Sequence, residues 1–146
     1  MPSKARMIKE MIKLAELKDG QTVFDLGAGD GRVLIEAKRE CPGIKAIGVE
    51  LVPTVWLYGR VKIWLSKAKI SFLWGDAFYK DISSADIVFL YLFPDVLTKF
   101  GKKFDKELRP GTRVISNAFE FKNRKPIQVA EIPCGKKVRK VFVYEW

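Results

Sequence analysis

The chain has 146 residues, 48% of them hydrophobic and 30% charged, so it is long enough for one domain with a full core and too apolar to be disordered. No apolar run approaches the roughly 20 residues of a membrane-spanning helix. The net charge is +10, and residues 96–146 hold thirteen Lys and Arg against five Asp and Glu, which favours an anionic partner or else a solvated face.

The first half of the chain predicts helices that alternate with short strands. Apolar residues at helical spacing within residues 1–18 indicate an amphipathic helix that Asp19 and Gly20 end. The β-rich run 22–26 enters a glycine-rich turn, and residues 32–40 follow as a helix. A strand over 44–49, a helix over 54–67 with Pro53 at its first turn, and a strand over 70–74 come next.

The second half completes the same pattern. Residues 85–92 are almost continuously apolar, which is typical of a parallel strand covered on both faces. A helix over 95–108 and a strand over 112–116 follow, and runs 127–132 and 138–144 indicate a hairpin around Gly135. The sequence therefore predicts a single α/β domain over residues 1–146. Its fold class is a doubly wound, Rossmann-like, mostly parallel seven-stranded sheet with a C-terminal antiparallel hairpin.

Ligands of such sheets bind beyond the carboxyl ends of the strands, and the first of these ends carries three glycines. Gly27, Gly29 and Gly31 follow a G-x-G-x-G spacing that matches neither the dinucleotide fingerprint nor a phosphate-binding Walker loop. Asp25 precedes them, and an acid at that point suits a ligand with an ammonium group better than a pyrophosphate. The alternative is a tight strand-to-helix turn without a ligand.

Two further acids follow the next two strands. Glu50 is placed to accept hydrogen bonds from the vicinal hydroxyls of a ribose. Asp76 is placed to accept one from an exocyclic adenine amine, with the N–H of Ala77 facing a ring nitrogen. Each acid alone could be a solvated cap or a turn residue. Three acids at three successive strand ends together indicate a site for an adenosyl compound with an amino group.

The residue types also restrict the chemistry. Histidine is absent, which excludes Ser-His-Asp and Cys-His nucleophile systems and His-ligated zinc. Cys41 and Cys134 fit neither a metal spacing nor a disulfide framework, so we expect no metal site and a reducing, cytoplasmic setting. The N-terminal segment lacks the apolar stretch of a secretory signal, which agrees with that expectation.

Three segments, DLGAGDG at 25–31, GVE at 48–50 and WGDA at 74–77, resemble the S-adenosylmethionine site of class I methyltransferases. The resemblance covers nearly the whole chain. It implies that the glycine-rich loop passes the methionine part of the cofactor and that Asp25 holds the amino group. It also implies Glu50 on the ribose and Asp76 on the adenine. The implied cofactor-binding residues are Asp25, Gly27, Ala28, Gly29, Gly31, Glu50, Leu51, Asp76 and Ala77.

A narrower resemblance extends over residues 48–64, 76–97 and 103–121, which are similar to small protein-lysine methyltransferases of the archaeal broad-specificity type and the mitochondrial ATP synthase c-subunit type. It implies transfer of a methyl group to an accessible lysine of a protein substrate. Those proteins carry an aromatic-Val-Pro-Ser/Thr lid segment ahead of the first helix. Only Pro2 and Ser3 match it here, so we expect a short or missing lid.

We expect the residues that bind the methyl acceptor to follow the fourth and fifth predicted strands. Residues 91–94 read Tyr-Leu-Phe-Pro, which differs from the Asn/Asp-Pro-Pro-Tyr/Phe motif of enzymes that methylate base amines. Four aromatic residues could line a channel for an alkyl-ammonium arm: Tyr91, Phe93, Phe119 and Phe121. Asn117 and Glu120 could bind or desolvate the acceptor amine. Aromatic core residues and ordinary loop polars are the alternatives.

Aromatic and basic residues alternate between positions 56 and 72. The aromatic ones are Trp56, Tyr58, Trp64 and Phe72, and the basic ones nearby are Arg60, Lys62, Lys67 and Lys69. We expect a buried helix whose bases extend to solvent. Peripheral contact with an anionic membrane, a protein partner or RNA are the alternatives. An RNA or small-molecule methyltransferase, or a cofactor-binding module without activity, remain rival functions, and the sequence does not predict the oligomeric state.

Overall fold

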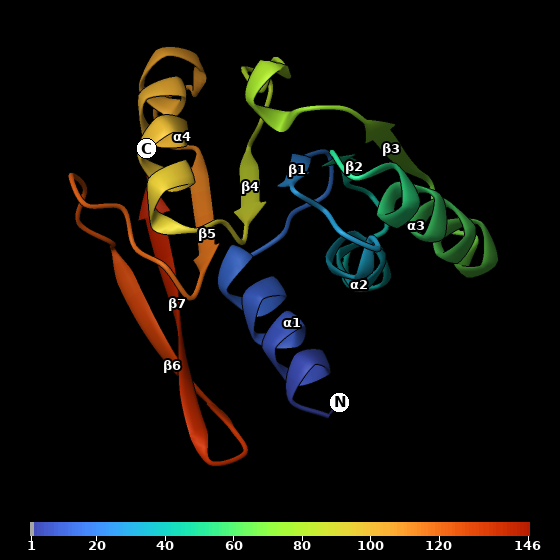
Figure 1. Cartoon of the computed structure of the whole chain (residues 1–146), viewed down its shortest axis with the longest axis horizontal. Helices are drawn as coiled ribbons and strands as arrows, with labels where there is room; N and C mark the ends of the chain where they lie inside the picture. The colour runs from blue at the N-terminus through green and yellow to red at the C-terminus, as the bar shows by residue number, and fades with distance from the viewer. Residues whose placement is uncertain (1) are drawn as a thin grey trace.

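The computed structural model describes residues 2–146 and confirms the predicted order of α-helices and strands, to which it adds one short 3-10 helix (Figure 1). The helices are α1 (Pro2–Ala15), α2 (Arg32–Glu40), α3 (Pro53–Ser66), the short 3-10 helix η1 (Ala77–Tyr79) and α4 (Pro94–Glu107). The strands are β1 (Thr22–Leu26), β2 (Lys45–Glu50), β3 (Ile70–Trp74), β4 (Ile87–Leu90), β5 (Arg113–Asn117), β6 (Gln128–Cys134) and β7 (Lys137–Glu145). Pro2 and Ser3, the two residues that match the lid segment, belong to the first turn of α1. Met1, which the predicted helix within residues 1–18 includes, lies outside the described residues.

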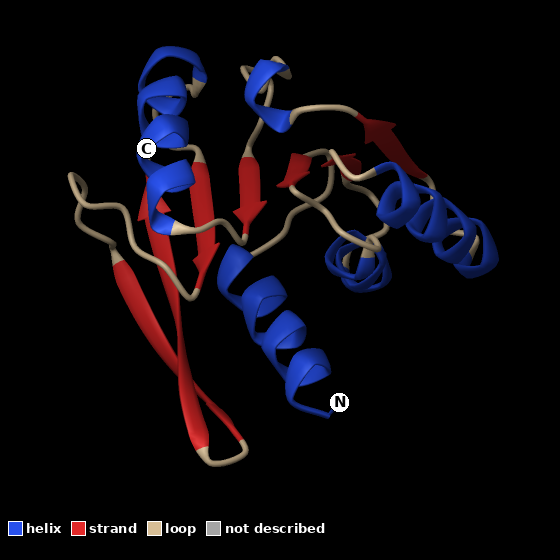
Figure 2. Ribbon diagram, in the orientation of Figure 1, coloured by secondary structure: helices blue, strands red, loops and turns tan. Residues whose placement is uncertain are grey.

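The seven strands form one sheet in the order β3-β2-β1-β4-β5-β7-β6 (Figure 2). The first five are parallel, whereas β7 pairs antiparallel with β5 and β6. The predicted doubly wound sheet with a C-terminal hairpin is therefore confirmed. The strand order reverses between β1 and β4, where Asp25 has Gly48 as its neighbour on one side and Phe89 on the other. This reversal is the point at which such sheets bind ligands.

The core consists of two main layers because successive side chains of a strand point to opposite faces of the sheet. Val23 and Ile115 lie in the layer that α1 and α2 cover, together with Met11 and Leu34. Phe24 and Val114 lie in the opposite layer, together with Phe104 of α4. The helices thus hold the strands from both sides and leave the carboxyl ends of β1, β4 and β5 free to carry a site.

Two predicted elements are shorter in the structure. The apolar run 85–92 contains only the four residues of β4, because the N–H of Ala85 donates to Ile82 in a turn and the chain leaves the sheet before Tyr91. The first helix ends at Ala15, since Glu16 has a left-handed φ of 52°. Both changes move residues from regular structure into loops at the ends of the sheet.

The prediction of a buried helix over 54–67 is wrong. Only Gly59 and Ile63 of α3 are buried, and the side chain of Trp64 is exposed at the surface. Trp56 is partly covered, and its indole N–H donates to the carbonyl of Phe72 at 3.1 Å. The reason is topological, because β3 lies at the sheet edge and α3 has neighbours on one side only. Within residues 2–146, none of the helices has the length and apolarity needed to span a bilayer.

Gly31 fixes the contact between the glycine-rich loop and α3. Its φ is +82°, and a Cβ there would lie 3.0 Å from the Cδ1 atom of Ile63. We expect Gly31→Ala to lower the free energy of unfolding by about 2–3 kcal/mol, from backbone strain plus crowding. Gly20 is the matched control, since its φ is +86° and no atom lies within 4 Å of the same position. Gly20→Ala should cost only about 1 kcal/mol in urea unfolding, and equal costs would contradict the crowding.

Candidate functional site

A cavity of about 840 Å³ lies at the carboxyl end of the sheet, where the strand order reverses. Its size is that of a small-molecule site. Six of the predicted site residues line it: Asp25, Gly27, Ala28, Gly29, Tyr91 and Asn117. The other predicted residues, namely Gly31, Glu50, Leu51, Asp76, Ala77, Phe93 and Glu120, are outside this lining. The structure therefore brings the glycine-rich loop and the ends of β4 and β5 into one hollow.

The glycine-rich loop presents its backbone to the cavity. The N–H groups of Gly27 and Ala28 both donate to the carbonyl of Val49, at 2.9 and 3.0 Å, which holds the loop against β2. Gly29 has a φ of +59°, and no atom lies within 4 Å of the position that a Cβ would occupy. A ligand can therefore approach the backbone closely at Gly29. Gly31, in contrast, packs on Ile63 and supports α3.

Asp25 is a buried carboxyl that lines this cavity, with 5% of its surface exposed. Burial raises its pKa from 3.8 to about 7, and the negative charges of Glu50 and Asp30 add to the effect. Asp30 itself is paired with Lys62 at 2.9 Å and with Arg32 at 2.6 Å. Among the described residues no cation forms an ion pair with Asp25, so a cationic ligand group is the natural partner of its charged form.

Glu50 supports the loop from the end of β2. Its Oε1 accepts a hydrogen bond from the N–H of Gly29 at 2.9 Å, and its Oε2 accepts one from the N–H of Val52 at 3.0 Å. Each carboxylate oxygen retains a second lone pair. Glu50 thus joins the glycine-rich loop to the start of α3 and keeps the capacity to accept further hydrogen bonds. Leu51, the next residue, is exposed.

Asp76 and Ala77 are not part of the cavity. Asp76 is exposed, and its side chain accepts a hydrogen bond from the N–H of Phe78 at 2.9 Å, so that it caps η1. Ala77 packs against the core layer beneath α4. The N–H of Gly75 donates to the carbonyl of Glu50, which keeps the ends of β2 and β3 adjacent. The structure therefore places two of the three acids together, while the third lies beyond the neighbouring strand end.

The aromatic residues after β4 and β5 divide into two groups. The ring of Tyr91 stacks on that of Phe119 with centroids 6.2 Å apart, and Phe93 lies against Phe119 at 5.6 Å. Tyr91 and Phe93 are both largely exposed. Phe121 does not line a channel and follows the core alternative, because this residue is buried and its N–H donates to the hydroxyl of Tyr144. An accessible cluster of three aromatic rings remains beside the cavity.

Asn117 contributes the feature of the site that points most directly to a ligand. Its Oδ1 atom is buried and has no hydrogen-bond partner among the residues described. A buried carbonyl oxygen without a partner costs about 1–3 kcal/mol, which a ligand N–H can recover. Glu120, three residues later, is exposed and lies away from the cavity lining.

Sequence reasoning did not find the residues that α1 and the β6–β7 hairpin add to the cavity. These are Lys4, Met7, Ile8 and Met11 of α1, with Cys134, Lys137 and Arg139 of the hairpin. Tyr58 of α3 also lines it. Their spacing carries no signal, since they meet only because the hairpin lies beside α1 (Figure 1). The exposed bases Lys4, Arg32, Lys137 and Arg139 give the cavity a positive rim.

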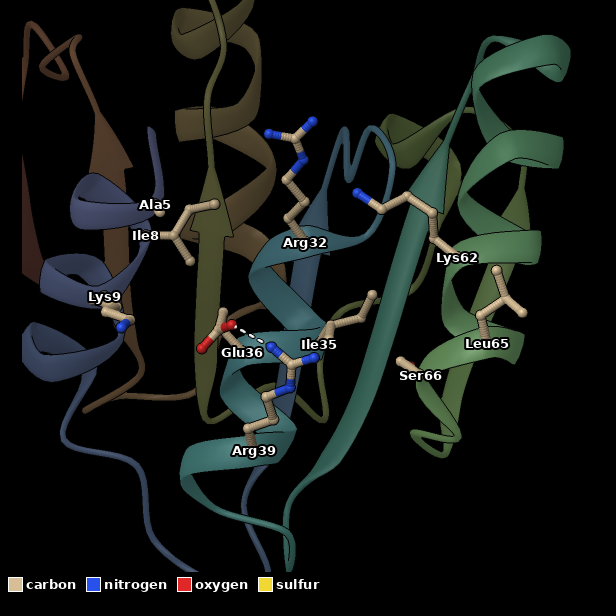
Figure 3. A pocket seen from close by; sticks show the side chains of 10 residues that line it. All are labelled: Ala5, Ile8, Lys9, Arg32, Ile35, Glu36, Arg39, Lys62, Leu65 and Ser66. Carbon is tan, nitrogen blue, oxygen red and sulfur yellow. Dashed lines mark hydrogen bonds and ion pairs between the residues drawn. The ribbon is translucent and has the colours of Figure 1, made fainter. Parts of the chain in front are cut away.

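A second hollow of about 570 Å³ lies between α1, α2 and α3, next to the first (Figure 3). Arg32 and Ile8 belong to both linings. Arg39 forms an ion pair with Glu36 at 2.7 Å, and Lys62 is held by Asp30. The hollow contains no residue that the sequence singles out for chemistry, and most of its charged side chains already have partners.

Known methyltransferases are similar to this chain in sequence. The family described as the ANTKMT methyltransferase domain matches residues 25–128. A protein-lysine N-methyltransferase of Saccharolobus islandicus is 31% identical, over 99% of this chain and 91% of that protein. The Homo sapiens lysine N-methyltransferase of the ATP synthase c-subunit is 30% identical, over 99% of this chain and 60% of that protein. The chain thus spans about three fifths of the human relative.

Solved structures show the same architecture. An RNA methyltransferase of Salinibacter ruber in complex with S-adenosyl-L-homocysteine has a TM-score of 0.88 and 30% identity, covering 95% of this chain and 89% of that chain. A methyltransferase of Aquifex aeolicus has a TM-score of 0.73, covers 98% of this chain and 93% of that chain, and at 18% identity shows the fold alone.

Proposed function

We propose that this chain, which belongs to the ANTKMT family of S-adenosylmethionine-dependent methyltransferases, methylates the side-chain amine of a lysine in a protein substrate. The observation that carries the proposal is the single cavity that joins Asp25 and the glycine-rich loop to Tyr91 and Asn117. The near full-length similarity to the Saccharolobus islandicus protein supports the choice of lysine.

The residues present fit the cofactor. S-adenosylmethionine, when bound, supplies a methyl group on a positively charged sulfur, so that the protein needs no histidine or cysteine for the transfer. We assign its amino group to Asp25, which is buried, lines the cavity and forms no ion pair within the described residues. The open backbone at Gly29 fits its close approach. Glu50, which holds the loop at Gly29, is assigned to the ribose. Asp76 with Ala77 is assigned to the adenine, which would then extend beyond the cavity lining toward the end of β3.

The acceptor amine has a separate set of residues. Tyr91, Phe93 and Phe119 form an accessible aromatic cluster that suits an alkyl-ammonium arm through cation–π and packing contacts. The unpartnered Oδ1 of Asn117 is assigned to an N–H of the amine, where it would orient the nitrogen. Burial in this pocket lowers the pKa of the amine, so that water can remove its proton before transfer. Glu120 is exposed and would act only from the entrance.

Transfer of radiolabelled methyl groups into cell extract tests the proposal. We expect label in material that protease removes and nuclease leaves intact, and acid hydrolysis should release the label as methylated lysine. Asp25→Ala is the inactive control, because it removes the residue assigned to the cofactor. Label in another amino acid, or label that only nuclease removes, would contradict a protein-lysine acceptor.

RNA methylation is the second candidate function, because two observations favour it. The cavity rim carries four exposed bases, and a relative of similar fold at 30% identity bears the name RNA methyltransferase. This function predicts nuclease-sensitive label and an RNA affinity that falls steeply as salt rises. The same labelling experiment therefore decides between the two acceptors. Cofactor binding with label in neither would indicate a binding module.

A further inference from the structure

The outward side of α3 carries an apolar ridge. Leu57, Val61 and Trp64 form it together with Leu65, which lies at its margin and also lines the second hollow (Figure 3). The four side chains are 60%, 49%, 77% and 66% exposed in that order. Their spacing of three and four residues places them on one side of the helix. The opposite side holds the buried Gly59 and Ile63, which pack against the glycine-rich loop and Phe72.

This ridge is not needed to fold the helix. A surface helix of a globular protein normally has one apolar side toward the core and a polar side toward water. In α3 both sides are apolar, although the inner side alone contacts the sheet. Leu51, Val52 and Trp74 add exposed apolar surface near the start of the helix, where the indole N–H of Trp74 donates to the carbonyl of Leu51 at 3.0 Å. Several exposed apolar side chains on one helix and its flanking strand end indicate a binding surface.

The charges around the ridge have one sign. Residues 51–75 contain Arg60, Lys62, Lys67 and Lys69 and no Asp or Glu. Lys62 is paired with Asp30, whereas Arg60, Lys67 and Lys69 form no ion pair within the described chain. The guanidinium of Arg60 lies 5.7 Å from the ring centre of Trp56. The partner of this surface is therefore expected to be apolar within and negatively charged around.

We propose that the apolar ridge of α3 docks this protein on an anionic lipid bilayer as a peripheral contact. Leucine, valine and tryptophan insert at the boundary between headgroups and acyl chains, and flanking Lys and Arg bind anionic headgroups. RNA fits less well, since Leu57 and Val61 offer no ring on which a base can stack. A second copy also fits less well, because a symmetric contact would bring Arg60 and Lys67 toward their own counterparts.

The ridge lies close to the candidate site. Val55 and Tyr58 of the same helix line the cofactor cavity, and Tyr58 is the neighbour of Leu57 in the chain. Docking would bring the cavity near the membrane surface, so that acceptor lysines close to lipid headgroups are favoured; this consequence rests on the proposed function. Docking also offsets an electrostatic repulsion. A chain of net charge +10 repels a cationic acceptor, whereas an anionic membrane surface attracts both.

Sedimentation with vesicles of equal parts phosphatidylglycerol and phosphatidylcholine tests the docking. We expect binding that phosphatidylcholine alone does not support. The double variant Trp64→Ser, Leu65→Ser should reduce the partition coefficient at least about tenfold, since it removes the two most exposed side chains of the ridge. The matched control is Ile127→Ser, Val129→Ser, which removes exposed apolar side chains at the opposite edge of the sheet and should bind as the unchanged protein does.

Several results would overturn the proposal. The ridge variant could bind the anionic vesicles as tightly as the unchanged protein does. The ridge variant and the control variant could lose the same amount of vesicle binding. The unchanged protein could bind phosphatidylcholine vesicles as tightly as anionic ones. A dimer that the ridge variant dissociates would show that a second copy occupies the ridge, and an RNA gel shift that the same variant abolishes would show that RNA does. Asp25→Asn should bind vesicles normally, because Asp25 is buried in the cavity and is not part of the ridge. Failure of lysine methylation with intact vesicle binding would thus reject the proposed function alone.

Discussion

Asp25→Asn is expected to weaken S-adenosylmethionine binding about 100-fold and, at the same time, to stabilise the ligand-free protein at pH 8. The affinity falls because the amide cannot supply the negative charge that a buried ammonium needs, and the loss of one partner in such a pair costs several kcal/mol. The stability rises because the unchanged protein keeps a carboxyl buried near Glu50 and Asp30.

The sign of the pH effect follows from the pKa of Asp25. It is 3.8 in an unfolded chain and about 7 in the folded protein, so the unfolded state releases its proton first as the pH rises. Stability from this group is therefore lost between about pH 4 and pH 7, and the loss is complete above that range. Its size is on the order of 4 kcal/mol. Asp25→Asn removes the loss, so the Tm at pH 8 should rise by several degrees.

Calorimetric titration and thermal unfolding at pH 5 and pH 8 measure both effects. The affinity of the unchanged protein should increase from pH 6 to pH 8, because the carboxyl must ionise to bind the ammonium, whereas the variant should show no such increase. Asp95→Asn is the control, since Asp95 is an exposed acid of α4 outside the cavity. A variant that binds as tightly as the unchanged protein, or that is less stable at pH 8, would contradict the assignment.

The order of elements was predictable because each segment carries a local signal. The run 22–26 is β-rich and ends in glycines, and the structure has β1 over the same residues. Residues 85–92 are almost continuously apolar, which is typical of a central strand covered on both faces. The structure has β4 within this run, between β1 and β5. The proximity of Asp25 and Glu50 followed as well, since the carboxyl ends of neighbouring parallel strands meet at one edge.

Whether a single side chain is buried or exposed was not predictable from such local signals. Trp64 of α3 and Phe121 after β5 are both aromatic residues in apolar segments, yet the first is exposed and the second is buried. The difference depends on what lies opposite each residue. An edge strand leaves α3 uncovered, while Tyr144 of β7 and Phe104 of α4 enclose Phe121. Lys137 and Arg139 reach the cavity only through the position of the hairpin, which no local pattern contains.

Glu50→Gln is expected to lower the affinity for S-adenosylmethionine roughly 30-fold or more and to lower the pKa of Asp25. In the unchanged protein the two carboxylate oxygens accept from the N–H groups of Gly29 and Val52 separately. A glutamine has only one carbonyl oxygen, which can take the place of one of the two. Its NH₂ group then faces the other backbone N–H, and two donors cannot form a hydrogen bond. One backbone N–H loses its partner, which costs about 1–3 kcal/mol, and the loop that presents Gly29 to the cavity loosens.

The pKa of Asp25 separates this role from a general loss of stability. The charge of Glu50 is one of the causes that raise that pKa, so its removal should lower it. The stability lost between pH 5 and pH 8 should therefore be smaller in Glu50→Gln than in the unchanged protein, even though the variant is less stable at both pH values. Glu36→Gln on α2 is the control, because Glu36 pairs with Arg39 away from the cofactor cavity. An unchanged pH dependence would show that Glu50 supports the loop without acting on Asp25.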